Sequence, residues 1–396
     1  MINLINISDL NSTVEKSPFP YRIVVKPIGP ICNLDCEYCF YLDKEEMYPK
    51  KHSFRMKDEV LERLIHQYIE SQPVGVKEIN FAWQGGEPTL LGVDFFKRVV
   101  ALQKYYQRPG TNITNAMQTN GTLLNDEWGE FLAENNFLIG ISVDGNMKLH
   151  DKLRKTKTGQ GSYDQVKRGI NILKKYKVEH NFLCVINSVN GEQPSRVYQA
   201  LKKLGAEHIQ FIPIVEHEYL SGDTTVDSKT RVSKNSVKPK MFGQFLNEVF
   251  HSWYKEDVGK VFIRNFEDIF AKLAGVGGSM CVHAEQCGKN IAIEHDGKVY
   301  SCDHFVFDDY YQGNLMEQSL SSLVTQASQV TFGENKKNQM NQECFTCEYR
   351  QLCHGGCPAH RIVKDGADYH KNYLCEGYKY FYRNSSKAIT EVMRSL

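Results

Sequence analysis

Apolar residues in the first half of the chain follow two alternating patterns. Short runs rich in β-branched and aromatic residues are typical of strands that are buried on both faces of a parallel sheet. Longer stretches between them, such as residues 56–71 (MKDEVLERLIHQYIES), place apolar residues at the spacing of an amphipathic helix. The strand-like runs comprise residues 21–27, 78–84, 113–120, 137–144, 180–187 and 208–215.

This alternation predicts an α/β fold built from six βα units. The pattern alone leaves a partial barrel and an open doubly wound sheet as alternatives. In both folds, ligands bind at the carboxyl ends of the strands. The segments CNLDCEYC, QGGEP, QTNG and SVDG all lie where strand-like runs end, so we expect the functional site at that edge of the sheet.

The second half of the chain has a different pattern. Residues 217–240 are polar and poor in large apolar groups, which predicts a surface loop or an inter-domain linker. Helical spacing returns in residues 241–256 and 263–275. Residues 290–302 (NIAIEHDGKVYSC) predict a β-hairpin, because an Asp-Gly turn signal separates two apolar runs.

Length and charge narrow the class of protein. A chain of 396 residues suits two domains, or one large domain with an appended module. The net charge of +1 offers no electrostatic footprint for nucleic acid or an anionic membrane, so we expect neither partner. The chain has no apolar run of membrane-spanning length, and its N-terminus lacks the basic and apolar regions of a secretion signal. These features predict a cytoplasmic protein.

Twelve cysteines are many for a cytoplasmic chain, in which thiols serve as metal ligands or redox groups more often than they form disulfides. Three lie near the start, eight lie in the last third, and Cys184 lies alone in a strand-like run, where we expect a buried core thiol. Cys32, Cys36 and Cys39 form a C-x3-C-x2-C motif. The spacing fits either structural zinc completed by a distant histidine or an iron–sulfur cluster with one iron left open.

The cysteine motif, with an aromatic residue before its last cysteine and a GGEP segment at 85–88, resembles the signature of the radical S-adenosylmethionine (SAM) enzymes. The resemblance covers the first 216 residues and implies a partial (β/α)6 barrel with one [4Fe–4S] cluster, whose fourth ligand is SAM itself. The positions that match SAM contacts are Tyr38, Gly85, Gly86, Glu87, Ser142, Arg154 and Val215. Without the resemblance, Ser142 would be a loop cap and Val215 a core residue.

The C-terminal cysteines suffice for two fully ligated sites, and a C-x2-C pair among them suits zinc as readily as iron–sulfur. Their order resembles the SPASM extension of radical SAM enzymes, which carries two auxiliary [4Fe–4S] clusters. By that resemblance, one cluster is held by Cys281, Cys287, Cys302 and Cys357. The other is held by Cys344, Cys347, Cys353 and Cys375. The expected total is three clusters.

Together these features predict four segments. An N-terminal segment (1–20) precedes the radical SAM partial barrel (21–235). A helical connection (236–275) then leads to a SPASM domain (276–396), which holds the two auxiliary clusters and ends in a C-terminal helix.

Three stretches, CNLDCEYCFYL, QTNGTL with FLAENNFLIGISVDG, and VYSCDHFVF, resemble segments of the anaerobic sulfatase-maturating enzymes in the same order. These enzymes oxidise a Cys or Ser of a sulfatase to Cα-formylglycine. The resemblance implies a 5′-deoxyadenosyl radical that abstracts a Cβ hydrogen, Asp303 as general base and an auxiliary cluster as electron acceptor. Without it, Asp303 would be a solvated carboxylate at a hairpin end or a helix N-cap.

The implied partners are an unfolded or nascent sulfatase peptide with a C/S-x-P/A-x-R motif and a reductant such as flavodoxin or ferredoxin. The sequence leaves open whether Cys, Ser or both are oxidised. One alternative is a SPASM peptide maturase that forms a thioether or another crosslink on a ribosomal peptide. Such enzymes often carry a further N-terminal domain, for which the residues before the first strand are too few. A non-enzymatic electron-transfer or zinc protein is the other alternative, but it has no use for an open three-cysteine site.

Overall fold

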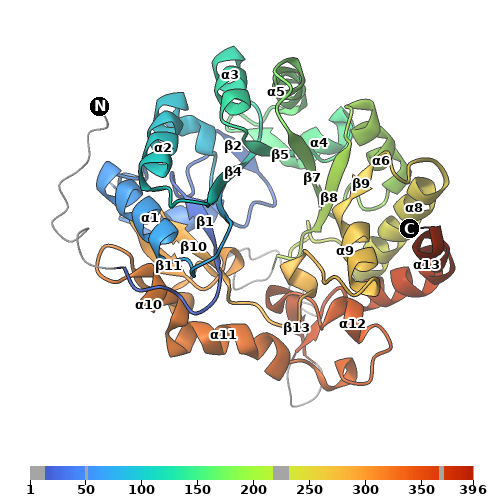
Figure 1. Cartoon of the computed structure of the whole chain (residues 1–396). Coiled ribbons are helices and arrows are strands. Elements are labelled where there is room, and N and C mark those ends of the chain that lie inside the picture. The colour runs from blue at the N-terminus through green and yellow to red at the C-terminus, as the bar shows by residue number, and fades with distance from the viewer. Residues whose placement is uncertain (1–13, 50–51, 217–231, 365–369, 396) are drawn as a thin grey trace.

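A computed structural model of the chain describes residues 14–49, 52–216, 232–364 and 370–395. Its main feature is one curved sheet with helices around its outside (Figure 1). The strands of this sheet are β1 (Arg22–Lys26), β3 (Glu78–Trp83), β4 (Asn112–Thr119), β5 (Leu138–Ser142), β7 (His180–Ile186), β8 (His208–Pro213), β9 (Phe262–Ile263), β10 (Asn290–Glu294), β11 (Lys298–Tyr300) and β12 (Tyr311–Asn314). They are ordered β12-β11-β10-β1-β3-β4-β5-β7-β8-β9.

The six strands predicted from the apolar runs are all present and pair in parallel, as β1-β3-β4-β5-β7-β8. Among the described strands, the two ends of the sheet, β12 and β9, are not paired with each other, so the barrel is partial. The expected α/β partial barrel is therefore confirmed. The helices that accompany the parallel strands are α1 (Asp58–Ser71), α2 (Val93–Tyr106), α3 (Asp126–Glu134), α4 (Met147–Leu153), α5 (Tyr163–Lys175), α6 (Pro194–Lys203), α8 (Pro239–Glu256) and α9 (Arg264–Leu273).

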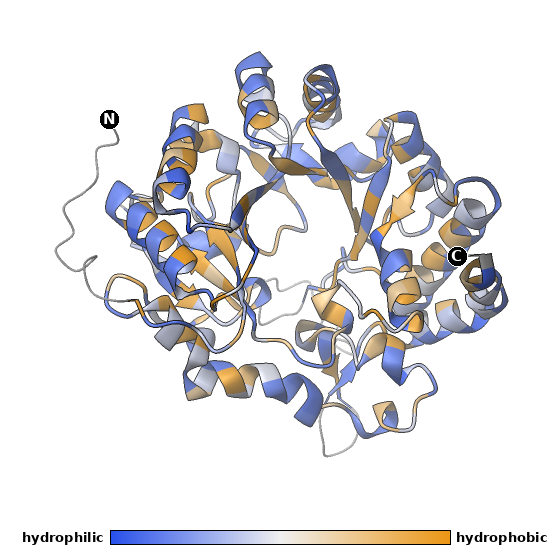
Figure 2. Ribbon diagram, in the orientation of Figure 1, coloured by the Kyte–Doolittle hydropathy of each residue, from blue (hydrophilic) through white to orange (hydrophobic). Residues whose placement is uncertain are grey.

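The barrel strands have one face toward the helices and the other toward the interior. In β7, Phe182 and Cys184 are fully buried in the main hydrophobic core, whereas Leu183 and Val185 line an interior cavity. Alternation with a period of two is the geometry of a β-strand. Cys184 is thus the core thiol that the sequence predicts. Figure 2 shows blue and orange mixed along both the strands and the surrounding helices.

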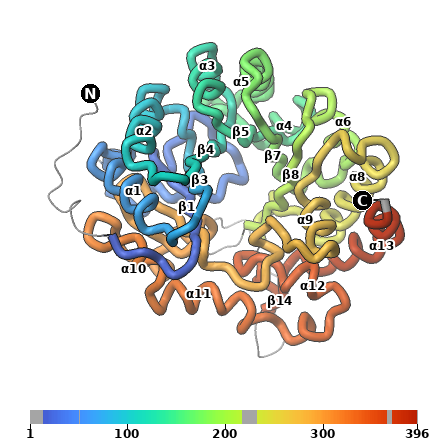
Figure 3. Tube along the Cα trace, in the orientation of Figure 1, coloured from blue at the N-terminus to red at the C-terminus, as the bar shows by residue number. Residues whose placement is uncertain are grey.

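The cysteine-rich half of the chain continues the same sheet. β10 pairs in parallel with β1, Arg22 opposite Asn290, and β11 pairs antiparallel with β10. The predicted hairpin is confirmed, and Gly297, with φ +86°, supplies the left-handed turn residue. The sequence did not indicate that this hairpin extends the barrel sheet. In Figure 3 the orange trace of this region lies beside the blue trace of the first strand.

The remaining elements do not belong to the main sheet. They include β2 (Leu34–Cys36), which pairs with β6 (Arg154–Thr156), and α10 (Leu320–Thr325), α11 (Ala327–Asn338), α12 (Arg350–Cys353), β13 (Arg361–Val363), β14 (Lys371–Asn372) and α13 (Cys375–Ser395). Short 3-10 turns are η2 (Leu42–Met47), η3 (Pro88–Leu91), η4 (Cys281–His283), η5 (Asp303–Phe305), η6 (Asp308–Tyr310), η7 (Gln342–Cys344) and η8 (Pro358–His360). In the described part of the chain, none of the helices has both the length and the apolar character that crossing a membrane requires.

Part of the predicted polar loop is buried. Residues 217–231 lie outside the described residues, but Val232 and Val237 are buried, and α8 begins at Pro239. Asn235 is also buried, and it donates from Nδ2 to the Glu37 carbonyl at 2.9 Å while its own carbonyl accepts from Ser188 N–H at 2.9 Å. The expectation of a surface loop is therefore wrong for residues 232–237, of which only Lys234 is exposed. Hydrogen bonds to neighbouring loops compensate the burial of these polar groups.

Candidate active site

A cavity of about 250 Å³ lies at the carboxyl ends of the barrel strands. It brings together the three motif cysteines, all predicted SAM-contact residues and the predicted base, namely Cys32, Cys36, Cys39, Tyr38, Gly85, Gly86, Glu87, Ser142, Arg154, Val215 and Asp303. Gln118, Thr119 and Asn120 of the QTNG segment also line it. The site is therefore located where the order of strands and motifs predicts it.

The cysteine loop is fixed by backbone pairing. β2 runs through the loop and pairs antiparallel with β6, so that Cys36 lies opposite Arg154. Leu34 N–H donates to Cys32 Sγ at 3.4 Å, and Asn120 Nδ2 donates to the same sulfur at 3.7 Å. Burial raises the pKa of Cys32 to about 11 and that of Cys36 to about 12. Thiolates in this cavity therefore need a cationic partner, and three cysteines aimed at one space fit an iron–sulfur cluster.

The GGEP segment packs tightly against the loop that leads into the cysteine motif. A Cβ on Gly86 would lie 1.9 Å from the Ile31 carbonyl oxygen, so the glycine serves a close approach within the chain. Gly86 N–H donates to the Gly29 carbonyl at 2.7 Å, and Glu87 N–H donates to the Ile31 carbonyl at 2.9 Å. Gly85 has φ +132°, a conformation that favours glycine.

The Glu87 carboxylate is almost fully buried, and it accepts hydrogen bonds from nearby residues of the chain. Oε1 accepts from Thr89 N–H at 3.1 Å and from Thr119 Oγ1 at 2.7 Å, and Oε2 accepts from Asn120 N–H at 2.7 Å. Burial raises the pKa of Glu87, although these hydrogen bonds oppose the rise. Glu87 thus joins the GGEP segment to the end of β4. It would therefore support a bound ligand indirectly, by holding this loop in position.

Arg154 belongs to a buried network of charged and polar groups. Its Nη1 donates to the Tyr38 hydroxyl at 2.7 Å, and the Tyr38 hydroxyl donates in turn to Asp144. Asp144 Oδ1 also accepts from Val185 N–H at 3.0 Å, while burial raises the pKa of this carboxyl. Arg154 Nε is buried and has no hydrogen-bond partner among the described residues. A free guanidinium N–H beside a cavity suits a carboxylate ligand.

Asp303 enters the cavity from the C-terminal half of the chain and is held by residues of the barrel. Its Oδ1 forms an ion pair with Lys26, and its Oδ2 accepts from Gln84 Nε2 at 2.9 Å. The side chain of Lys26 is only 2% exposed and that of Asp303 is 16% exposed. Burial raises the pKa of Asp303, but the nearby Lys26 and His304 lower it by more than burial raises it. The pKa of Asp303 therefore lies below its usual range. The carboxyl is therefore ionised at neutral pH.

Sequence reasoning missed Lys26, Gln84 and Tyr41. Lys26 ends an apolar strand. A charged residue at the carboxyl end of a buried strand could have indicated a site residue. Gln84 directly precedes the GGEP segment. The Lys26 ammonium also lies 4.3 Å from the centre of the Tyr41 ring, and the Tyr41 hydroxyl donates to Glu294. No sequence pattern indicated the contact between Tyr41 and Glu294, because these two residues are far apart in the chain.

The eight C-terminal cysteines fall into two spatial sets. Cys344, Cys347, Cys353 and Cys375 all line a small cavity of about 30 Å³. In the other set, burial raises the pKa of Cys357 to about 11, and the nearby Cys281 and Cys287 contribute to the rise. Burial and the neighbouring Cys357 likewise raise the pKa of Cys302. Each predicted group of four thus lies together, and four clustered thiols fit a metal cluster that stabilises thiolates.

Comparison with known families tests the two resemblances. Residues 27–203 match the Radical SAM superfamily, and residues 281–348 match SPASM, an iron–sulfur cluster-binding domain. Both resemblances are confirmed. The two domains imply iron–sulfur clusters and SAM.

A serine-type anaerobic sulfatase-maturating enzyme of Bacteroides thetaiotaomicron is 41% identical over 378 residues, which cover 93% of this chain and 90% of that enzyme. The chain belongs to the anaerobic sulfatase-maturating enzymes. This family generates formylglycine, so the non-enzymatic alternative is wrong. A cysteine-type anaerobic sulfatase-maturating enzyme of Clostridium perfringens is 32% identical, covering 95% of this chain and 99% of that enzyme.

Solved structures agree with membership of the sulfatase-maturating family. The structure of native anSMEcpe with bound AdoMet and Cp18Cys peptide has a TM-score of 0.85 and 32% identity, covering 95% of this chain and 99% of that chain. Streptococcus suis SuiB bound to precursor peptide SuiA has a TM-score of 0.59 and 15% identity, over 90% of this chain and 76% of that chain. SuiB shares the fold.

Proposed function

We propose that the chain oxidises a Ser or Cys side chain in an unfolded or nascent sulfatase to Cα-formylglycine, in the cytoplasm. One observation carries the proposal. The Asp303 carboxylate, fixed by Lys26 and Gln84, lines the same cavity as the three-cysteine loop. A base for the substrate and a site for radical generation thus lie within one enclosed space.

The residues that would hold the cofactors follow from the same cavity. Cys32, Cys36 and Cys39 would bind one [4Fe–4S] cluster, and the two C-terminal cysteine sets would bind two more. Tyr38, Gly85, Gly86, Glu87, Ser142, Arg154 and Val215 would surround SAM. When bound, the clusters and SAM supply a 5′-deoxyadenosyl radical and an acceptor for one electron.

The protein's own residues have the task of positioning and of moving a proton. Conversion of a CH2–OH or CH2–SH group to an aldehyde or thioaldehyde removes one Cβ hydrogen atom, one electron and one proton. Asp303 Oδ2 would accept that proton, since Lys26 and Gln84 fix the carboxylate in its ionised form. Water then converts the thioaldehyde of a Cys substrate to the aldehyde, with release of hydrogen sulfide. His304, Phe307 and Ala359 close the C-terminal side of the cavity.

We propose serine as the preferred substrate residue. The chain is 41% and 37% identical to two serine-type enzymes, from Bacteroides thetaiotaomicron and Klebsiella aerogenes, and 32% identical to the cysteine-type enzyme of Clostridium perfringens. The peptide would carry the C/S-x-P/A-x-R motif, and a flavodoxin or ferredoxin would supply electrons. We also propose the segment boundaries 1–20, 21–235, 236–275 and 276–396 for the four parts of the chain.

The decisive experiment follows peptide mass and 5′-deoxyadenosine together. Anaerobically reconstituted enzyme is incubated with SAM, a reductant and peptides that differ only in Ser or Cys at the target position. We expect both peptides to be converted to the mass of the aldehyde product, and the Ser peptide to react faster than the Cys peptide. In Asp303→Asn we expect peptide conversion to fall by about 10²–10⁴-fold, because the proton acceptor is lost, while SAM cleavage persists.

The matched control is Asp309→Asn, which alters an exposed carboxylate on the neighbouring turn η6. It should leave both products unchanged. If Asp303→Asn converts peptide at the rate of the parent enzyme, Asp303 is not the base. If SAM is cleaved while neither peptide changes, the enzyme acts on another substrate.

A further inference from the structure

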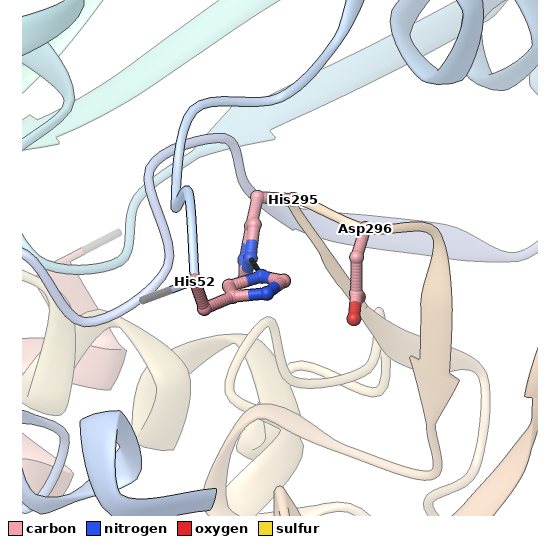
Figure 4. Close-up of side chains that lie close together, drawn as sticks. All are labelled: His52, His295 and Asp296. Atoms are coloured by element: carbon pink, nitrogen blue, oxygen red, sulfur yellow. Dashed lines mark hydrogen bonds between the residues drawn. The ribbon is translucent and has the colours of Figure 1, made fainter. Parts of the chain in front are cut away.

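Three potential metal ligands lie together outside the active-site cavity. His52 belongs to the segment between η2 and α1, and His295 and Asp296 form the turn between β10 and β11 (Figure 4). One ligand atom from each residue can be chosen so that all lie within 4.8 Å of one another. Two imidazoles and one carboxylate are ligands that a borderline divalent ion such as Zn²⁺ accepts.

The two imidazoles face each other directly. His52 Nε2 lies 2.7 Å from His295 Nε2, and Figure 4 shows this contact as a dashed line. Nitrogen ligands of a tetrahedral ion with bonds of about 2.0–2.1 Å lie about 3.3 Å apart. A shift of about 0.6 Å between the rings would therefore admit an ion. His52 is half-buried, at the surface end of the contact, and can supply this movement.

The other nitrogen of His295 has the partner that metal-binding histidines usually have. Its Nδ1 lies 3.4 Å from Glu294 Oε2, and both side chains are 1% exposed. A proton on Nδ1, donated to this carboxylate, leaves the Nε2 lone pair free and directed at His52. Carboxylate–histidine pairs of this kind fix the tautomer and orientation of metal ligands.

Packing also orients the His52 ring. The ring is stacked on Tyr48 with centroids 4.6 Å apart, and Phe54 meets it edge-on at 5.0 Å. With the His295 proton on Nδ1, His52 Nε2–H donates to the His295 Nε2 lone pair, and an ion that binds between the rings would displace this proton.

The charges around the two rings favour a cation. Glu294 and Asp296 place two carboxylates beside the rings; Lys298 Nζ lies 3.1 Å from Asp296 Oδ2, and Lys44 lies near Glu294. Asp296 Oδ1 accepts from Lys298 N–H at 3.3 Å. The Lys298 side chain is 35% exposed and can move into solvent, which would free Oδ2 for an ion.

We propose that His52, His295 and Asp296 form a binding site for a divalent transition-metal ion of the Zn²⁺ type. The ion fastens the segment before α1 to the β10–β11 turn, and so joins the N-terminal and C-terminal halves of the chain outside the active site. This site is separate from the iron–sulfur cysteines and does not depend on the proposed substrate.

The test uses the reconstituted enzyme with its clusters intact. After a chelator removes loosely held metal, the protein is dialysed anaerobically against Zn²⁺, and bound zinc is counted and examined by X-ray absorption at the zinc edge. We expect one zinc per chain with nitrogen and oxygen ligands at about 2.0–2.1 Å and no sulfur at about 2.3 Å. His52→Gln and Asp296→Asn should each lower the affinity at least tenfold.

Two further variants make the test specific. His251→Gln, at another half-buried histidine, should bind zinc as the parent does. Lys298→Met should bind it more tightly, because the competing ammonium is removed. Cluster absorbance shows that each variant is folded. Absence of zinc, sulfur in its ligand shell, or unchanged binding in His52→Gln would each overturn the proposal.

Discussion

The two walls of the active-site cavity are built in different ways. On the barrel wall, Arg154, Tyr38 and Asp144 bond to one another, and every partner comes from the radical SAM part of the chain. On the C-terminal wall, Asp303 is held by Lys26 and Gln84, which belong to the barrel. The first wall is complete within one part of the chain, whereas the second exists only after the two parts have joined.

This difference separates two steps of the proposed reaction. The barrel wall is the one that we assign to SAM, so damage to it should remove SAM cleavage and peptide oxidation together. The C-terminal wall supplies the proton acceptor, so damage to it should leave SAM cleavage intact and reduce peptide oxidation. The ratio of 5′-deoxyadenosine to oxidised peptide distinguishes the two cases.

The largest effect is expected for Arg154→Met. The change leaves Asp144 and Tyr38 without their buried cation, and breaking a buried charge pair costs about 3–5 kcal/mol. We expect 5′-deoxyadenosine and oxidised peptide both to disappear, and the midpoint of anaerobic urea unfolding to fall. Lys155→Met, which removes an exposed lysine paired with Glu37, is the control and should keep both products. SAM cleavage at the parental rate in Arg154→Met would contradict the assignment of this wall.

A smaller and more selective effect is expected for Lys26→Met. The change removes the ammonium that lowers the pKa of Asp303, so the carboxylate is protonated at higher pH than in the parent. We expect peptide oxidation to fall about tenfold or more at pH 6 and less at pH 8, with SAM cleavage retained. Arg22→Met, at the exposed end of the same strand, should behave as the parent. If 5′-deoxyadenosine and oxidised peptide fell equally, Lys26 would be needed for SAM cleavage and would not act through Asp303.

The smallest effect concerns the contact between the two walls. The Lys44 ammonium lies 3.1 Å from the centre of the Phe307 ring, and burial lowers the pKa of Lys44 to about 8. Between this value and the usual lysine value of 10.5 the unfolded chain binds more protons than the folded chain, so the free energy of unfolding should rise with pH by about 1 kcal/mol. Urea unfolding across this range measures the rise.

Lys44→Met should abolish this dependence on pH and leave SAM cleavage unchanged. Lys57→Met, at an exposed residue, is the control and should keep the dependence. A parental slope in Lys44→Met would show that another group titrates.

Sequence patterns predicted the local parts of this molecule well. The six parallel strands follow from apolar runs of β-branched and aromatic residues, and the β10–β11 hairpin follows from its Asp-Gly turn. The positions of the predicted SAM contacts around one cavity follow from motifs placed at strand ends. These features depend on short stretches of sequence, which is why they can be derived without a structure.

Features that depend on distant contacts could not be derived. Lysine is usually a surface residue, and the burial of Lys26 is explained by its ion pair with Asp303 and its contact with the Tyr41 ring. Asn235 lies in a polar stretch, yet backbone groups of two other loops satisfy it. Gly86 lets the Ile31 carbonyl come close to the backbone, and the GGEP motif does not indicate this contact. In each case the deciding partner is remote in sequence.

The pairing of β1 with β10 has a consequence for how the protein is made. Its partners are about 270 residues apart, so during synthesis the open edge of β1 waits until most of the chain has left the ribosome. An unpaired edge strand invites association with other chains. The emerging enzyme therefore passes through a stage at which the unpaired edge of an unfinished chain must be kept from associating with other chains.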